Sequence, residues 1–410
     1  MTPEVAAPDP RARLAAIGAA DLVVGVPGCG TAEAIRAAAE AVARAVQPIA
    51  PGARIVVAHP LGVSVDEPDV DGAPRLLACA LAAPGPLPVV TDDPHDPFRS
   101  LFTAAAALGA RACALVGAPP EQIGEASLGP LLRPVLDLGI DLALPCYVRH
   151  RFDLLINTGI VYPLMRALHG RRVRCQIGVD FAFSERLFAG PLQTATPARF
   201  GRAQWFVSEA ACAGLQMCQS NLGTSLPPPP DGVDVSTVLA QVLGSLFLDV
   251  ERTAACWQRT RGSQPVQTIG SAGEYVDGQR TVDTSGMVES FRLGYRNLQG
   301  VWGRVLPPAT LLELSRLTRA DAGAFRLPDA LWARIVYDFA LGHRLRVINR
   351  DHLLKAMTPA YLAWAASFVG ELGERDGAAT DARVEQLCAA FEAEKPYLVS
   401  RWRWPDRFNP

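Results

Sequence analysis

In the first half of the chain, short apolar runs alternate with alanine-rich stretches whose apolar residues recur at helical spacing. Apolar runs bounded by turn residues predict buried strands at 21–27, 54–59, 87–90 and 111–116. The stretch 32–46 predicts an amphipathic helix between the first two strands. Strands that alternate with helices in this way are typical of a parallel sheet in an α/β protein.

Beyond residue 232 the pattern changes to longer stretches with apolar residues at helical spacing. Helices are predicted at 235–259, 306–317, 328–341, 352–372 and 381–397. The Gly-, Ser- and Thr-rich stretch 268–288 predicts a loop. We therefore divide the chain into an N-terminal tail (1–20), an α/β domain (21–232) and a helical C-terminal region (233–410).

Composition and charge narrow the class of protein. The 410 residues are 49% hydrophobic and 20% charged, which is enough for a large core. The formal net charge of −2 argues against nucleic acid or an anionic membrane as the main partner. No apolar run is long enough to span a bilayer, and residues 1–14 lack a secretory signal pattern, so we expect a cytoplasmic protein. The nine cysteines stand singly, and we expect small core residues rather than zinc ligands.

The stretch 145–184 carries the most polar chemistry in the chain. A basic cluster, Arg149-His150-Arg151, is followed by Asp153 and Asn157, and an acidic turn closes the stretch at Asp180. Guanidinium groups pair bidentately with phosphate and carboxylate oxygens, so this density of Arg and His favours an anion-binding pocket. The alternative is a solvated surface strand followed by a core helix.

A second candidate site is the turn after the first predicted strand, where Gly28-Cys29-Gly30-Thr31 precedes the predicted helix 32–46. A strand, a glycine turn and a helix N-terminus together make an opening suited to a nucleotide phosphate. Any α/β protein needs such a turn, however, so the Gly-x-Gly pattern is weak by itself.

Three segments of the stretch 145–184 resemble a bacterial branch of the family-2-type glycosyltransferases. They are Tyr-x-Arg-His from Tyr147, Val161-Tyr162-Pro163-Leu164, and Gln176-Ile177-Gly178-x-Asp180-Phe181. That branch is similar to glucosyl-3-phosphoglycerate and mannosylglycerate synthases. The resemblance implies a GT-A fold, which is a Rossmann-like sheet that takes a nucleotide sugar and a divalent metal.

The resemblance also assigns roles to particular residues. It implies that a nucleotide sugar or another phosphorylated small molecule binds this chain, with Asp180 as the surviving catalytic carboxylate. Substrate and phosphate binding fall to Arg149, His150, Arg151, Asp153, Asn157, Tyr162 and Arg166. Nucleotide binding falls to Pro27, Gly28 and Arg99.

The metal-binding positions of that branch are altered in this chain. The resemblance implies Mg²⁺ or Mn²⁺ held by Asp-x-Asp after the fourth strand, by a later acidic residue and by a histidine. This chain instead has Gly117, Ala118 and Pro119, then Ala203, then Pro227. None of these side chains can coordinate a hard cation. We therefore expect no metal cofactor.

Two hypotheses for the function follow, and a third stays open. The chain is a glycosyltransferase whose metal-dependent catalysis is lost or altered, with Arg149, Arg151 and Arg166 available to neutralise a diphosphate. Alternatively, it is a pseudo-glycosyltransferase that acts as a ligand-binding or scaffold partner of an active paralogue, or within a homo-oligomer. In the third hypothesis the resemblance is one of structure only, and the polar residues of the stretch 145–184 serve only in packing.

Overall fold

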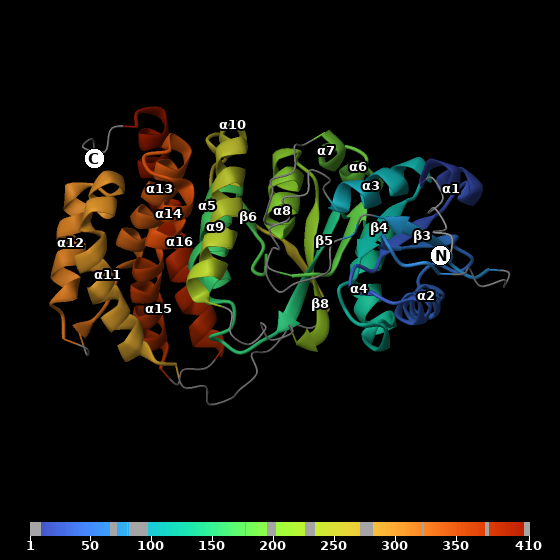
Figure 1. The fold of residues 1–410 in the computed structure, drawn as a ribbon, viewed down its shortest axis with the longest axis horizontal. Coiled ribbons are helices and arrows are strands. Elements are labelled where there is room, and N and C mark those ends of the chain that lie inside the picture. Colours follow the sequence, from blue (N-terminus) through green and yellow to red (C-terminus); the bar gives the residue numbers. More distant parts are fainter. Residues whose placement is uncertain are drawn as a thin grey trace, which may run out of the picture.

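A computed structural model describes residues 10–65, 72–79, 81, 97–176, 178–194, 202–225, 234–270, 282–321, 324–373 and 377–405. An eight-stranded sheet with helices on both faces forms one side of the molecule. A bundle of helices from the second half of the chain forms the other side, and the two termini lie at opposite ends (Figure 1).

The sheet has the strand order β3-β2-β1-β4-β7-β5-β8-β10. Every neighbouring pair is parallel except the two that involve β7, which runs antiparallel to both β4 and β5. The strands are β1 (Leu22–Gly25), β2 (Ile55–Pro60), β3 (Arg75–Cys79), β4 (Ala112–Leu115), β5 (Leu142–Val148), β7 (Phe181–Ser184), β8 (Met217–Ser225) and β10 (Gln267–Ile269). A second, two-stranded sheet pairs β6 (Arg171–Arg172) with β9 (Gln264–Pro265).

Side-chain alternation along the strands divides the core between the two faces of the sheet. Leu22 and Val24 pack with α2 and α4, whereas Val23 packs with α3, α5 and α8. Successive strand residues point to opposite faces, so a strand that is buried on both sides is apolar throughout. The helices are α1 (Pro10–Ile17), α2 (Ala32–Val46), α3 (Pro97–Ala107), α4 (Glu125–Asp137), α5 (Tyr162–His169), α6 (Glu185–Phe188), α7 (Pro191–Thr194) and α8 (Arg202–Cys212), with short turns η1 (Pro120–Gln122) and η2 (Asn157–Val161).

The helical region packs around four fully buried tryptophans: Trp257, Trp302, Trp332 and Trp364. Its core is continuous with the α3/α5/α8 face of the sheet. The helices are α9 (Val235–Arg252), α10 (Ala254–Trp257), α11 (Thr284–Val305), α12 (Pro308–Thr318), α13 (Asp329–Leu345), α14 (Arg350–Ala356), α15 (Thr358–Leu372) and α16 (Gly377–Arg403). No helix in the described ranges combines the length and the apolar character that a bilayer crossing needs.

The predicted fold class, a Rossmann-like α/β sheet with a helical C-terminal extension, is confirmed by this architecture. The helix predicted at 32–46 coincides with α2. The strand predicted at 87–90 lies outside the described residues, and the third strand seen is β3. The loop predicted at 268–288 is wrong in part, because β10 occupies its start and α11 begins at Thr284, where Asp283 caps the helix.

The predicted division at residues 20 and 232 stays a prediction, and two features cross it. Helix α1 forms within the predicted tail and packs against β3. Strand β10 comes from beyond residue 233, yet it pairs with β8 at the edge of the main sheet.

Gly159 tests the contact between the sheet domain and the helical region. A Cβ atom at this position would lie 2.3 Å from the ring of Trp364, and the Gly159 carbonyl accepts the Trp332 indole N–H at 2.8 Å. We expect Gly159→Ala to lower the free energy of unfolding by about 1–3 kcal/mol, because the packed core cannot admit a methyl group. Urea denaturation measures the change.

The matched control is Gly300→Ala in α11, where a Cβ atom would meet no atom within 4 Å. Alanine is the better helix former, so this variant should gain about 0.5–1 kcal/mol. A Gly159→Ala protein as stable as wild type would contradict the close approach of Trp364.

Candidate ligand site at the carboxyl edge of the sheet

The carboxyl edge is the edge of the main sheet at which its parallel strands end. From β1 the strand order runs through β2 to β3 toward one edge of the sheet. The neighbour of β1 on its other side is β4, from which the sheet continues toward the opposite edge. Open α/β sheets bind ligands outside the carboxyl ends of the strands, at the point where the strand order reverses. In this sheet that point lies between β1 and β4.

The turn from β1 to α2, which contains Pro27 and Gly28, follows the carboxyl end of β1. Pro27 is buried and Gly28 is exposed. Thr31 caps α2, and its hydroxyl oxygen accepts the Ala34 N–H at 3.2 Å. The cap uses one of the free N–H groups of the first turn and leaves others directed toward the edge.

Asp180 lies at the same edge because β7 runs against its neighbours. One carboxylate oxygen accepts the Gly117 N–H at 2.9 Å, and the other accepts the Tyr147 hydroxyl proton at 2.6 Å. The Tyr147 oxygen in turn accepts the Val179 N–H at 3.3 Å. Burial raises the pKa of Asp180, while the hydrogen bonds from Tyr147 and from the Gly117 and Ala118 N–H groups oppose that rise.

The catalytic role of Asp180, which the resemblance implies, stays a prediction, and its contacts argue for a structural role. In the structure its side chain is 6% exposed, and both oxygens already accept hydrogen bonds. Asp180 therefore anchors the turn that follows β4, at the place where the resemblance puts a metal-binding motif.

The basic cluster after β5 forms one tight turn. Asp153 accepts the His150 N–H at 2.9 Å and donates its own N–H to the His150 carbonyl at 2.9 Å. The His150 ring accepts the Phe152 N–H at Nδ1, 3.2 Å away. Leu154 follows with φ of 56°, a left-handed conformation that costs energy for a branched side chain. The sequence predicted Asp153 as a substrate ligand, but the Asp153 contacts in the structure hold the turn itself.

Arg149, the first residue after β5, lies near the Cys146 thiol, as Arg174 does. Burial raises the pKa of Cys146, and the two guanidinium groups oppose that rise. The Nη1 atom of Arg149 is buried and has no hydrogen-bond partner among the described residues. A buried guanidinium nitrogen without a partner costs free energy, so this position favours an anionic ligand. Arg151 lies beside it in sequence, with its guanidinium carbon 5.2 Å from the centre of the Phe152 ring.

The contacts of Asn157, which the resemblance implies as a substrate ligand, are internal to the chain. It is fully buried in η2, where its amide group donates to the Arg174 carbonyl at 2.8 Å. Its oxygen accepts the Gln176 N–H at 3.2 Å. Both halves of the amide are therefore used to hold the segment 174–176.

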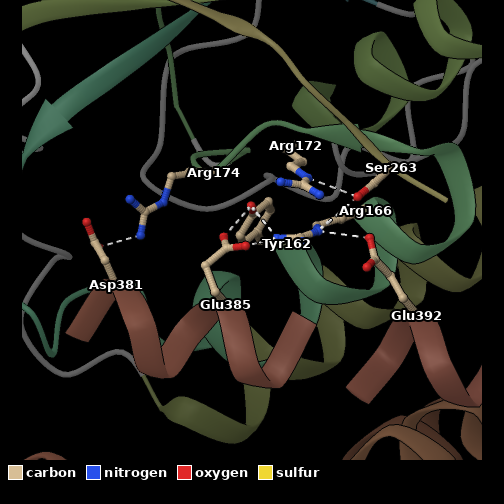
Figure 2. A network of polar contacts seen from close by, with 8 residues as sticks. All are labelled: Tyr162, Arg166, Arg172, Arg174, Ser263, Asp381, Glu385 and Glu392. Atoms are coloured by element: carbon tan, nitrogen blue, oxygen red, sulfur yellow. Dashed lines mark hydrogen bonds and ion pairs between the residues drawn. The ribbon is translucent and has the colours of Figure 1, made fainter. Parts of the chain in front are cut away.

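Tyr162 and Arg166 face α16 (Figure 2). Arg166 is 4% exposed; it donates to Glu385 at 2.6 Å through Nη1 and to Glu392 at 2.9 Å through Nε. The Tyr162 hydroxyl lies 3.3 Å from the Arg166 Nη1 atom. The predicted phosphate-binding role of Arg166 stays a prediction, and the two carboxylates that pair with this guanidinium argue against it.

Arg174 and Arg172 extend this network along α16. Arg174 pairs with Asp381 at 2.5 Å, and Arg172 donates to the Ser263 hydroxyl at 3.0 Å. The three acidic residues Asp381, Glu385 and Glu392 all lie on α16. Their side chains point toward Arg174 and Arg166 (Figure 2). Sequence reasoning missed these acidic residues, since a helix with scattered Glu and Asp normally indicates a solvated face.

A separate cavity of about 290 Å³ lies between α11 and α12. It was also missed, because its basic residues come from two helices that only tertiary packing brings together. Its lining includes Arg292, Arg296, Arg319, Tyr295 and Gln299.

Arg99, which the resemblance implies as a nucleotide-binding residue, lies in the first turn of α3.

The residues at the carboxyl edge do not fit the divalent metal that the resemblance implies. Gly117 and Ala118 direct their N–H groups at Asp180, and a cation needs oxygen ligands at that point. No cluster of three His, Cys, Asp or Glu side chains arranged as metal ligands occurs among the described residues. The side chain of Ala203 and all of Pro227 lie outside the described part. The groups that the edge offers to an anion are therefore N–H and guanidinium donors.

Comparisons with known proteins give a limited result. No family model matches the chain, and no curated protein matches it. Among solved structures, a glucosyl-3-phosphoglycerate synthase from Mycobacterium tuberculosis in complex with phosphoglyceric acid is similar. It is 17% identical and matches over 60% of this chain and 84% of its own, with a TM-score of 0.36.

A mannosyl-3-phosphoglycerate synthase from Rubrobacter xylanophilus is 14% identical, over 60% of this chain and 78% of its own, with a TM-score of 0.34. Glucosyl-3-phosphoglycerate synthase, one of the two kinds of synthase named from the sequence, is thus among the solved structures that match.

The Asp180 anchor yields a stability prediction. Asp180→Ala leaves the Gly117 N–H and the Tyr147 hydroxyl buried without an acceptor, so we expect a loss of about 2–4 kcal/mol in unfolding free energy. Tyr147→Phe removes one donor and should cost less, about 1–2 kcal/mol. Denaturant titration measures both, with the exposed Asp137→Ala as control, expected within about 0.5 kcal/mol of wild type. Unchanged stability of Asp180→Ala would contradict the anchoring role of Asp180.

A second prediction concerns Arg166. Arg166→Met keeps the apolar stem but leaves Glu385, Glu392 and the Tyr162 hydroxyl without their cation. Because both glutamates keep partial access to water, we expect a loss of about 1–3 kcal/mol, measured by thermal and urea unfolding. Arg44→Met is the control, since its pair with Glu40 is highly exposed and should contribute less than about 0.5 kcal/mol. Equal stabilities of the two variants would show that the buried pairs contribute nothing.

Proposed function

We propose that the carboxyl edge binds a nucleotide sugar or a related phosphorylated small molecule, in a glycosyltransferase-type protein whose metal-dependent transfer is lost or altered. The observation that carries this proposal is the buried, unpartnered nitrogen of Arg149 beside Arg174. A phosphate or carboxylate oxygen is the natural partner of such a group.

The separation of the candidate groups supports an elongated ligand. The β1–α2 turn and the turn after β5 stand three strand spacings apart, since β4 and β7 lie between β1 and β5. At about 4.8 Å per strand this is roughly 14 Å. A single phosphate cannot bridge this span, whereas a diphosphate-linked sugar and nucleoside can. The first turn of α2 would meet one end of the ligand, and Arg149 would meet a charged group toward the other.

The fixed position of Asp180 favours binding over metal-assisted transfer. In metal-dependent transfer the cation neutralises the leaving diphosphate, which is worth several kcal/mol. In this chain the turn after β4 supplies N–H groups, and Asp180 already accepts them. Guanidinium groups are then the remaining source of positive charge. A pseudo-glycosyltransferase that acts with an active paralogue is the alternative that the same observation favours.

Calorimetry with UDP-glucose, ADP-glucose and GDP-mannose, each in EDTA and in Mg²⁺ or Mn²⁺, tests the proposal. We expect at least one of them to bind with the same affinity in EDTA as with metal. Arg149→Gln should weaken that binding by tenfold or more, because it removes a charge-assisted hydrogen bond. Arg111→Gln, an exposed arginine at the opposite edge before β4, is the control and should bind normally.

Binding that requires Mn²⁺ would contradict the proposal and would mean that a metal site exists at the carboxyl edge. Failure of all three compounds to bind would leave the resemblance as one of fold only. Release of free sugar or its transfer to phosphoglycerate in EDTA would identify an active, metal-independent transferase rather than a pseudoenzyme.

A further inference from the structure

The cavity between α11 and α12 is lined by basic and polar side chains. Its volume is about 290 Å³, and it lies at the end of the molecule farthest from the main sheet (Figure 1). Its three basic residues are Arg292 and Arg296 of α11 and Arg319, which follows α12. Among the described residues that line it there is no Asp or Glu. The cavity therefore concentrates positive charge at a place separate from the carboxyl edge.

Arg292 holds one side of the cavity in place. Its guanidinium group donates to the Thr318 carbonyl at 3.1 Å and to the Ala320 carbonyl at 2.7 Å. These two carbonyls flank Arg319 in the chain, so the contacts fix the backbone of Arg319 beside α11. The Nη1 atom of Arg292 also pairs with the exposed Glu289 at 2.7 Å. Arg292 is thus neutralised within the chain, and its part in the cavity is to position the other groups.

The other two arginines are not neutralised in this way. Arg296 lies one turn beyond Arg292 on the same face of α11, because the two are four residues apart. Neither the Arg296 nor the Arg319 guanidinium group has a hydrogen bond or an ion pair with any residue in the described ranges. Like charges that line one cavity repel each other, and an anion that accepts hydrogen bonds from both would remove that repulsion.

Neutral donors complete the lining. The Gln299 amide and the Ser315 hydroxyl also have no hydrogen-bond partner within the part of the chain that the structure describes. Guanidinium, amide and hydroxyl groups from two helices suit the several oxygens of a phosphate group better than the planar pair of one carboxylate. Small-molecule sites have volumes of about 300–1,000 Å³, so a cavity at the lower end of this range fits a small ligand.

We propose that this cavity is a second ligand site, which binds a small phosphorylated molecule through Arg296 and Arg319. The phosphate oxygens accept hydrogen bonds from both guanidinium groups, while Arg292 keeps the two sides of the site together. The ligand thereby connects α11 to the end of α12. Because it binds the folded chain, it should also raise the melting temperature.

Calorimetry with inorganic phosphate, pyrophosphate and citrate tests the proposal on the full-length chain. Every sample carries Arg149→Gln, so that the cavity is measured apart from the carboxyl edge, whether or not that edge binds phosphate. Salt at about 0.15 M screens scattered surface charges. We expect saturable binding of one pyrophosphate per chain, with a rise in melting temperature. Adding Arg296→Gln and Arg319→Gln together should weaken this binding by tenfold or more, because two charge-assisted donors are lost.

The matched control adds Arg304→Gln and Arg316→Gln instead. Both are exposed arginines of α11 and α12 that lie outside the described lining of the cavity, and their loss changes the net charge by the same amount. This control should bind pyrophosphate as tightly as the Arg149→Gln protein. The proposal is overturned if the two double substitutions weaken binding equally, if no binding saturates, or if citrate binds more tightly than pyrophosphate. Equal melting temperatures of all samples without ligand confirm that the variants fold.

Discussion

The carboxyl edge depends on the reversed direction of β7. This strand enters the sheet between two parallel strands, so its first residue, Phe181, pairs with Leu115 at the end of β4. The preceding loop must come close to β5: a Cβ atom at Gly178 would lie 2.6 Å from Pro145. Only glycine permits that approach, and it delivers Asp180 to the Gly117 N–H and the Tyr147 hydroxyl. The edge is thereby closed around an internal carboxylate.

This closure has a chemical consequence for any ligand at the edge. A buried carboxylate that accepts backbone N–H groups uses the donors that a phosphate would otherwise receive. It also adds negative charge to the edge at which the proposed phosphorylated ligand would bind, and a cation would have to offset that charge. Among the described residues the arginines that follow β5 are suited to this, because Arg149 has an unpartnered buried nitrogen and Arg166 does not.

Sequence patterns predicted the local features and missed those that depend on distant residues. Strand β1 and helix α2 were predicted because the apolar spacing that specifies them lies in adjacent residues. The partners of Arg166 lie 219 and 226 residues away, and Asp180 meets Gly117 across 63 residues. The residue types at 166 and 180 were informative, but a phosphate-binding arginine and an internally paired one have the same local sequence.

The same distant contacts make the sheet domain and the helical region electrostatically dependent on each other. Arg166 is buried, and a buried cation without a partner is strongly destabilising. Its carboxylates come from α16, which also supplies Asp381 to Arg174. Without α16, these arginines would either unfold α5 locally or seek anions from solution. The helical region therefore decides which arginines are used internally, and so which remain for a ligand at the carboxyl edge.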